Sequence, residues 1–138
     1  MNFDTDLCKI GAGLSGLALA SKLQAEGGNV MVLEGRDRTG GRVLSQEGYD
    51  LGPSWIWPHN HRMLALLDGL GLNRFAQYAS GRLVFEDAAG RVSRDFEFAT
   101  MSGALRVEGG LGRVTDALAS RLGDRLRLAC RVRRVLED

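Results

Sequence analysis

Apolar and polar positions in the first part of the chain predict a strand, a helix and a second strand. Residues 7–10 form a short apolar run that ends at Gly11, and residues 14–23 place apolar side chains on one helical face. After Gly27 and Gly28, residues 30–33 form a continuous apolar run, which is typical of a parallel strand buried on both faces. These segments make a βαβ unit, so we expect an α/β fold with a parallel sheet.

The middle of the chain predicts a helix and a hairpin. Residues 60–70 have apolar positions at helical spacing, and Gly71 is placed to end that helix. Residues 83–85 and 92–98 are interpreted as the strands of a β-hairpin, joined by the turn-forming residues 87–90.

The last part of the chain predicts one more helix and one more strand. Residues 111–122 form an amphipathic helix, and residues 126–132 alternate apolar and polar positions, as a half-buried strand does. Residues 36–49 are polar and rich in glycine, which indicates a loop. Because no helix follows the last strand, we expect the α/β domain to be incomplete at its C-terminus.

Composition excludes several classes of protein. The 138 residues suit one domain, and 18 basic against 17 acidic residues give a net charge of +1, which favours no nucleic-acid partner. The sequence has neither a signal-peptide pattern nor an apolar run of membrane-spanning length, so we expect a cytoplasmic protein with no membrane partner. Cys8 and Cys130 lie far apart in apolar segments and are predicted to be reduced, buried thiols.

The turn between the first strand and the first helix carries a candidate phosphate-binding motif, Gly11-Ala12-Gly13-Leu14-Ser15-Gly16. In a G-x-G-x-x-G turn the first glycine permits the tight bend, the second lets a pyrophosphate approach the backbone, and the third lets helix and strand pack closely. Leu14 and Ser15 open the helix, whose free N–H groups favour phosphate. The position of this motif predicts a Rossmann-like dinucleotide site.

Glu34 follows the second strand, about 20 residues after the glycines, where a carboxylate accepts hydrogen bonds from an adenosine ribose. A carboxylate at this place repels a 2′-phosphate, which disfavours NADP. On these residues alone, FAD and NAD both remain as cofactors.

The loop after Glu34 reads Glu34-Gly35-Arg36-Asp37-Arg38-Thr39-Gly40-Gly41-Arg42. Arg36 and Arg42 can supply fixed charge to a pyrophosphate, and Gly40 and Gly41 permit close backbone approach. Gly35 is a further candidate cofactor-site residue, with Gly41. This ordering resembles the second signature of the flavin-containing amine oxidases, which implies FAD as the cofactor.

The resemblance continues in Asp50-Leu51-Gly52-Pro53-Ser54-Trp55, a segment that passes close to the flavin ring in that family. It implies cofactor-site roles for Gly52, Pro53, Ser54 and Trp55, and a secondary one for Val132, on a strand that meets the adenine. Residues 108–112 resemble the glycine turn that precedes a helix in the family.

The family resemblance implies one FAD-binding domain over residues 1–138, with residues 72–107 as a small excursion on the substrate side. It also implies an enzyme that transfers hydride from a C–H next to an amine nitrogen to flavin, with O₂ as acceptor. The short segment 99–107, where many amine oxidases have a long insertion, leaves open a renalase-like flavoprotein that oxidises a reduced nicotinamide. A third interpretation is a non-catalytic dinucleotide-binding fragment. The resemblance to the family assigns no catalytic residue to this sequence.

Lys9 and the two histidines depart from the pattern described so far. Lys9 stands where members of the family usually carry a small β-branched or aliphatic residue, so the first strand is expected to be weaker or more exposed at its edge. His59 and His61 lack neighbouring ligands at metal spacing and are interpreted as solvated or capping residues, so no metal is expected.

Overall fold

The computed structural model describes residues 4–96, 101 and 103–136. It contains a three-stranded parallel sheet. Its strands are β1 (Leu7–Ile10), β2 (Val30–Leu33) and β9 (Leu126–Arg127), in the order β1-β2-β9. β1 pairs with β2 over four residues, and β9 pairs with the end of β2. The predicted βαβ unit is therefore confirmed, with α1 (Leu14–Ala25) as its crossover helix.

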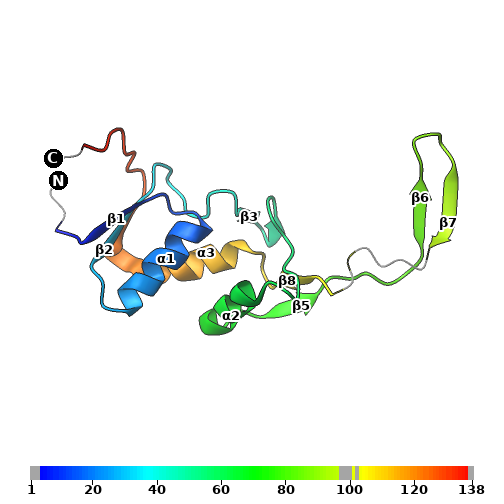
Figure 1. Ribbon diagram of the computed structural model, residues 1–138, viewed down its shortest axis with the longest axis horizontal. Coiled ribbons are helices and arrows are strands. Elements are labelled where there is room, and N and C mark those ends of the chain that lie inside the picture. Colours follow the sequence, from blue (N-terminus) through cyan, green and yellow to red (C-terminus); the bar gives the residue numbers. More distant parts are fainter. Residues whose placement is uncertain (1–3, 97–100, 102, 137–138) are drawn as a thin grey trace.

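Two more helices complete the core. α3 (Gly112–Leu122) lies beside α1, and α2 (His61–Leu70) packs against α3 (Figure 1). Both helices were predicted, and α2 ends at Gly71 in the left-handed conformation, as its sequence indicates. The buried side chains that join the sheet and the helices include Leu17, Val32, Leu67, Val114 and Leu118.

Residues 36–49 are not entirely loop, which corrects the prediction. β3 (Ser45–Gln46) and β4 (Tyr49–Asp50) form a short antiparallel hairpin around Glu47 and Gly48, both with positive φ. Strands of two residues carry too few side chains to show a period of two, so the sequence pattern could not reveal them.

A second short pairing was also absent from the prediction. β5 (Arg74–Ala76) and β8 (Leu105–Val107) pair antiparallel, so the segment 99–107 contains a strand where only a compressed connection was expected. Ile56 forms a further backbone bridge with Leu105. These partners are about 30 or more residues apart in sequence, and local patterning contains no information about such contacts.

The predicted β-hairpin is confirmed as β6 (Leu83–Glu86) and β7 (Val92–Phe96), although Phe98, included in the predicted strand, lies outside the described residues. The hairpin projects away from the rest of the molecule (Figure 1). Asp87 closes its turn, because its carboxylate accepts hydrogen bonds from the backbone N–H groups of Ala89 and Arg91.

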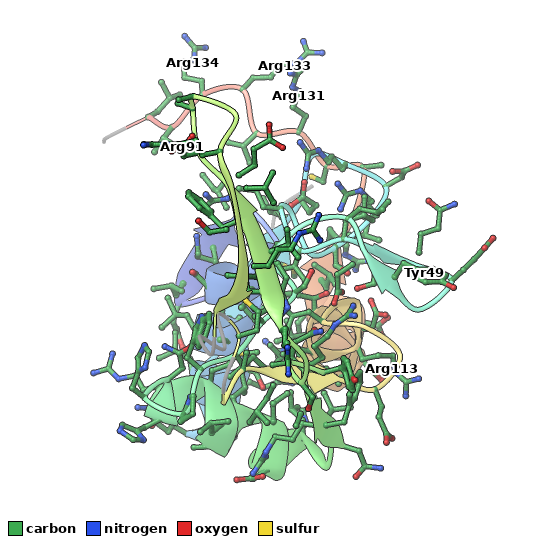
Figure 2. The ribbon with its side chains drawn as sticks, turned by 90° about the vertical axis from the view of Figure 1, so that its right-hand side faces the viewer. Tyr49, Arg91, Arg113, Arg131, Arg133 and Arg134 are labelled. Carbon is green, nitrogen blue, oxygen red and sulfur yellow. The ribbon has the colours of Figure 1, made fainter. Side chains whose placement is uncertain are left out.

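The prediction of a strand over residues 126–132 is wrong beyond Arg127. Ala129 adopts a left-handed φ of 52°, and the N–H groups of Ala129 and Cys130 donate to the carbonyls of Arg36 and Glu34. The chain therefore leaves the sheet to follow the loop after β2. The side chains of Arg131, Arg133 and Arg134 then point outward (Figure 2).

The edge of the sheet at β1 is open among the described residues. Leu7 and Ile10 are 42% and 49% exposed, in line with the weaker, more exposed strand that Lys9 suggested. Cys8 and Cys130 form no disulfide, but Cys8 is exposed and Cys130 half-buried, so the expectation of buried thiols is wrong. The reason is that Cys8 lies on this uncovered strand. No described helix has the length and apolarity needed to cross a membrane.

Candidate dinucleotide-binding site

Gly13 and Gly16 of the first motif have different structural roles. A Cβ on Gly16 would lie 2.1 Å from the Gly11 carbonyl oxygen, so only glycine lets α1 pack this closely against the turn. A Cβ on Gly13 would meet nothing nearer than the Gly40 oxygen at 4.0 Å. The space beside Gly13 is therefore open, as a backbone that receives a pyrophosphate requires.

The two sequence motifs meet in space. The Gly40 N–H donates to the Ala12 carbonyl at 2.8 Å, and Gly13 and Gly40 form a parallel backbone bridge. A Cβ on Gly41 would lie 3.4 Å from the Gly13 Cα, so the second loop lies directly against the first turn. This contact brings Arg36 and Arg42 to the N-terminus of α1.

A cleft of about 690 Å³ lies at this junction. Nine of the predicted cofactor residues line it: Gly11, Gly13, Leu14, Ser15, Gly16, Arg36, Gly41, Arg42 and Pro53. Three residues that were not predicted, Lys9, Ile10 and Val43, also line it. They directly flank the two motifs in sequence, and that proximity was the only signal available. Glu34, Gly35, Gly52, Ser54, Trp55 and Val132 do not line this cleft.

Glu34 is nevertheless tied to the turn. One carboxylate oxygen accepts the Ala12 N–H at 2.8 Å, and the other accepts the Arg36 N–H at 2.9 Å. The Arg36 N–H, the Ala12 N–H and the charge of Arg36 lower the pKa of Glu34 against the opposing effect of burial. Glu34 is thus an anion that holds both loops in register, and its remaining lone pairs can accept ribose hydroxyls.

The segment 50–55 runs beside the second loop. A Cβ on Gly52 would lie 2.2 Å from the Arg42 carbonyl oxygen, so Gly52 is needed for backbone packing. The Ser54 hydroxyl donates to the Gly52 carbonyl. Trp55 is 51% exposed, and its indole N–H donates to the side-chain oxygen of Gln77. The contacts of Gly52, Ser54 and Trp55 with a flavin remain predictions.

Gly35, directly after Glu34, lies against Arg131 near the end of the chain. The Cα and Cβ of Arg131 would both be 3.8 Å from a Cβ on Gly35. Val132 is half-buried just after the segment that bonds to Glu34 and Arg36. Its contact with an adenine also stays a prediction.

Asp50 and Ser45 are structural residues whose role sequence reasoning missed. The Asp50 carboxylate accepts the Leu111 N–H at 2.7 Å and the Ser45 hydroxyl at 2.5 Å. The Ser45 oxygen in turn accepts the Gly112 N–H at 2.7 Å. These N–H groups belong to the start of α3 and have no partner within the helix, so the β3–β4 hairpin caps α3.

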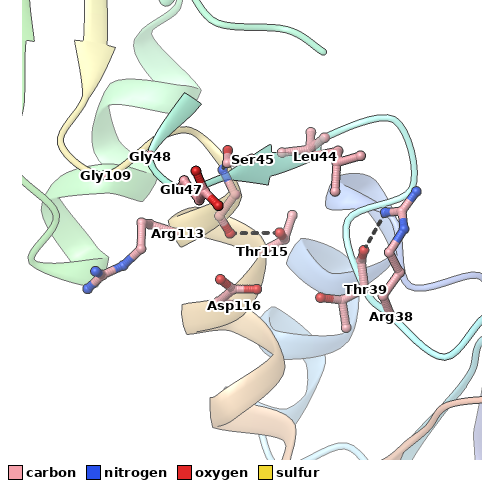
Figure 3. Close-up of a pocket in the computed structure, with 12 residues that line it drawn as sticks. Arg38, Thr39, Leu44, Ser45, Glu47, Gly48, Gly109, Arg113, Thr115 and Asp116 are labelled. Carbon is pink, nitrogen blue, oxygen red and sulfur yellow. Dashed lines mark hydrogen bonds between the residues drawn. The ribbon is translucent and has the colours of Figure 1, made fainter. Parts of the chain in front are cut away.

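A second cavity of about 360 Å³ lies between the loop around residues 38–48 and α3 (Figure 3). Arg38 and Arg113 line it together with Glu47 and Asp116, so its charges are mixed. Such a lining does not favour a polyanion, in contrast to the cleft at Gly13. His59 and His61 are exposed, and no cluster of metal-ligating side chains occurs among the described residues.

Comparison with known proteins decides the family. Residues 14–102, well over half of the chain, match the family described as flavin containing amine oxidoreductase. The chain belongs to this family. The predicted family, and FAD as the cofactor of that family, are therefore confirmed.

Members of the flavin containing amine oxidoreductase family align with part of this chain. Putrescine oxidase from Kocuria rosea is 42% identical over 86 residues, which cover 59% of this chain and 18% of that protein. Flavin-containing amine oxidase B from Homo sapiens is 38% identical over 89 residues, covering 61% and 17%. A probable flavin-containing monoamine oxidase A from Dictyostelium discoideum is 34% identical over 108 residues, covering 75% and 24%.

Solved structures of amine oxidases confirm the fold class. A putrescine oxidase bound to putrescine superposes with a TM-score of 0.81 at 21% identity, covering 91% of this chain and 51% of that one. Cyclohexylamine oxidase from Brevibacterium oxydans gives a TM-score of 0.82 at 17% identity, covering 92% and 51%. The chain thus spans about half the length of these structures.

Proposed function

We propose that this chain binds FAD and supplies the dinucleotide-binding part of an amine-oxidising flavoenzyme. The observation that carries the proposal is the contact between Gly13 and Gly40, which unites the glycine turn and the arginine loop in one cleft. Family membership supports the choice of FAD over NAD, which the residues alone left open. Bound in this cleft, FAD would supply the redox chemistry that the family resemblance implies, which is uptake of hydride from the carbon next to an amine nitrogen with O₂ as the acceptor.

The residues of the cleft fit the pyrophosphate and ribose of this cofactor. Backbone N–H groups at the start of α1 and the helix dipole favour the phosphates, and Arg36 and Arg42 add positive charge. Glu34 offers an acceptor to ribose hydroxyls while it holds Ala12 in place. The chain's part is therefore to bind and orient the cofactor.

A small-molecule amine is the proposed substrate, and the cytoplasmic location expected from the sequence stays a prediction. The small number of residues between β7 and β8, 97–104, supports a renalase-like flavoprotein as the alternative. Oxidation of an amine with release of hydrogen peroxide supports the first reading. Oxidation of a reduced nicotinamide without amine turnover supports the second.

The test of the cofactor proposal is the absorbance spectrum of the purified chain with and without added FAD. We expect flavin bands that shift on binding and remain with the protein after gel filtration. A colourless protein whose added FAD separates completely in gel filtration would contradict the proposal.

A further inference from the structure

Lys9 lies in the dinucleotide cleft although it belongs to neither motif. It pairs with Val32 in the sheet, and it lines the cleft together with residues 14–16 at the start of α1. Its Cε lies 3.2 Å from the position that a Cβ on Gly16 would take. A side chain at Gly16 would crowd the end of the lysine stem, so the stem and the start of α1 lie close together.

The charges around Lys9 suit an anion. The residues that line the cleft include three cations, Lys9, Arg36 and Arg42, and no carboxylate. The Lys9 ammonium donates one described hydrogen bond, to the Ile10 carbonyl at 2.9 Å. An ammonium has three N–H donors, so it can hold this contact and still donate to a phosphate oxygen.

We propose that Lys9 is a phosphate-binding residue of this site, which adds a third side-chain cation to the pyrophosphate cradle formed by the backbone at Gly13. The inference rests on the proposed function, because the pyrophosphate is that of the bound dinucleotide. It also gives a reason for a lysine on a strand of this kind. The stem lies beside Gly16, and the ammonium adds to the positive charge that Arg36 and Arg42 bring to the cleft.

The chain offers a matched control, because Lys9 and Lys22 are its two lysines. Lys22 lies near the C-terminal end of α1, with its side chain 75% exposed and paired to Glu26 at 3.9 Å. Lys22→Gln removes the same charge at the far end of α1, away from the residues that line the cleft.

The experiment is calorimetric titration of the full 138-residue chain with FAD, ADP and adenosine at low and high salt. Lys9→Gln should raise the Kd for FAD and ADP by about three- to tenfold at low salt, and less at high salt, because exposed charge contacts are screened. Adenosine, which has no phosphate, should bind as before. Lys9→Arg should retain binding, and Lys22→Gln should match the unchanged protein.

Three other outcomes of the titration would overturn the assignment of Lys9, and they differ in the ligands and variants whose binding changes. If Lys9→Gln binds ADP and FAD like the unchanged protein, Lys9 does not bind phosphate, and the proposed function is unaffected. If Lys9→Gln and Lys9→Arg weaken adenosine and ADP equally, Lys9 is only structural. If the unchanged chain binds neither FAD nor ADP, the proposed function fails and this inference fails with it.

Discussion

The Asp50 carboxylate accepts a hydrogen bond from the Leu111 N–H at 2.7 Å, across 61 residues of sequence. Arg106 lies on the other side of the same carboxylate, with a nitrogen 3.5 Å from its second oxygen. The Asp50 side chain is 1% exposed, so a buried anion connects the β3–β4 hairpin, β8 and the start of α3. The acid that the family resemblance placed near the flavin has a structural task in this chain.

Asp50→Ala is therefore expected to destabilise the fold. The change removes the acceptor for Leu111 and leaves the Arg106 charge without its partner, so we expect a loss of roughly 1–2 kcal/mol or more in the free energy of unfolding. Urea denaturation followed by circular dichroism measures it. Asp37→Ala, in an exposed position of the second loop, is the control. An equal loss in both variants would mean that Asp50 does not cap α3.

Gly13→Val should separate binding from folding. The backbone at Gly13 has φ −74° and ψ 170°, which any residue adopts, and the added side chain would enter the open cleft. We expect FAD affinity to fall by about tenfold or more while thermal stability changes little. Equilibrium dialysis against FAD measures the affinity.

Gly16→Ala serves as the counterpart of that variant. Its Cβ would collide with the Gly11 carbonyl oxygen, so this change should lower the melting temperature. Retained FAD affinity in Gly13→Val would show that the pyrophosphate does not lie beside Gly13.

Glu34→Ala should weaken FAD binding for two reasons. It removes the predicted acceptor for the ribose hydroxyls, and it releases the Ala12 and Arg36 N–H groups that shape the cleft. Hydrogen bonds to a charged group contribute about 1.5–3 kcal/mol, so an increase in Kd of tenfold or more is expected in a flavin titration. Glu26→Ala, at the far end of α1, should bind normally. Unchanged affinity in Glu34→Ala would refute the ribose assignment.

Glu34 also predicts a pH dependence of stability. Its pKa in the folded chain lies below the ordinary value of 4.5, chiefly because it accepts the Arg36 N–H. A carboxyl group of this kind stabilises the fold above its unfolded pKa, and that contribution is lost as the pH falls through the folded pKa.

Between about pH 5 and about pH 3, the free energy of unfolding should therefore fall more steeply in the unchanged chain than in Glu34→Gln. Urea denaturation at each pH measures both slopes. The pKa of Asp87 is also lowered, but that group is present in both proteins and cancels in the comparison. Parallel slopes would mean that Glu34 titrates alike in the folded and unfolded chains.

The spacing of apolar residues in the sequence was sufficient to predict the helices and strands in which that spacing repeats. β1, α1 and β2, the helices α2 and α3, and the β6–β7 hairpin all follow from the spacing of apolar positions and from turn residues. The order of the glycines, Glu34 and the arginines likewise predicted the candidate dinucleotide site, because each of those residue types suits one part of such a ligand.

Pairings between distant segments were decided by the tertiary structure. β5 meets β8, and Asp50 caps α3, because packing brings together backbone groups that need partners and lie far apart in sequence. The same reason accounts for Ala129, whose left-handed turn directs the last segment to Glu34 and Arg36 instead of along the sheet. Lys9 appeared in the sequence only as an unusual strand residue. Its place beside Gly16 in the lining of the cleft depends on the packing of α1 against β1 and the turn, which the tertiary structure decides.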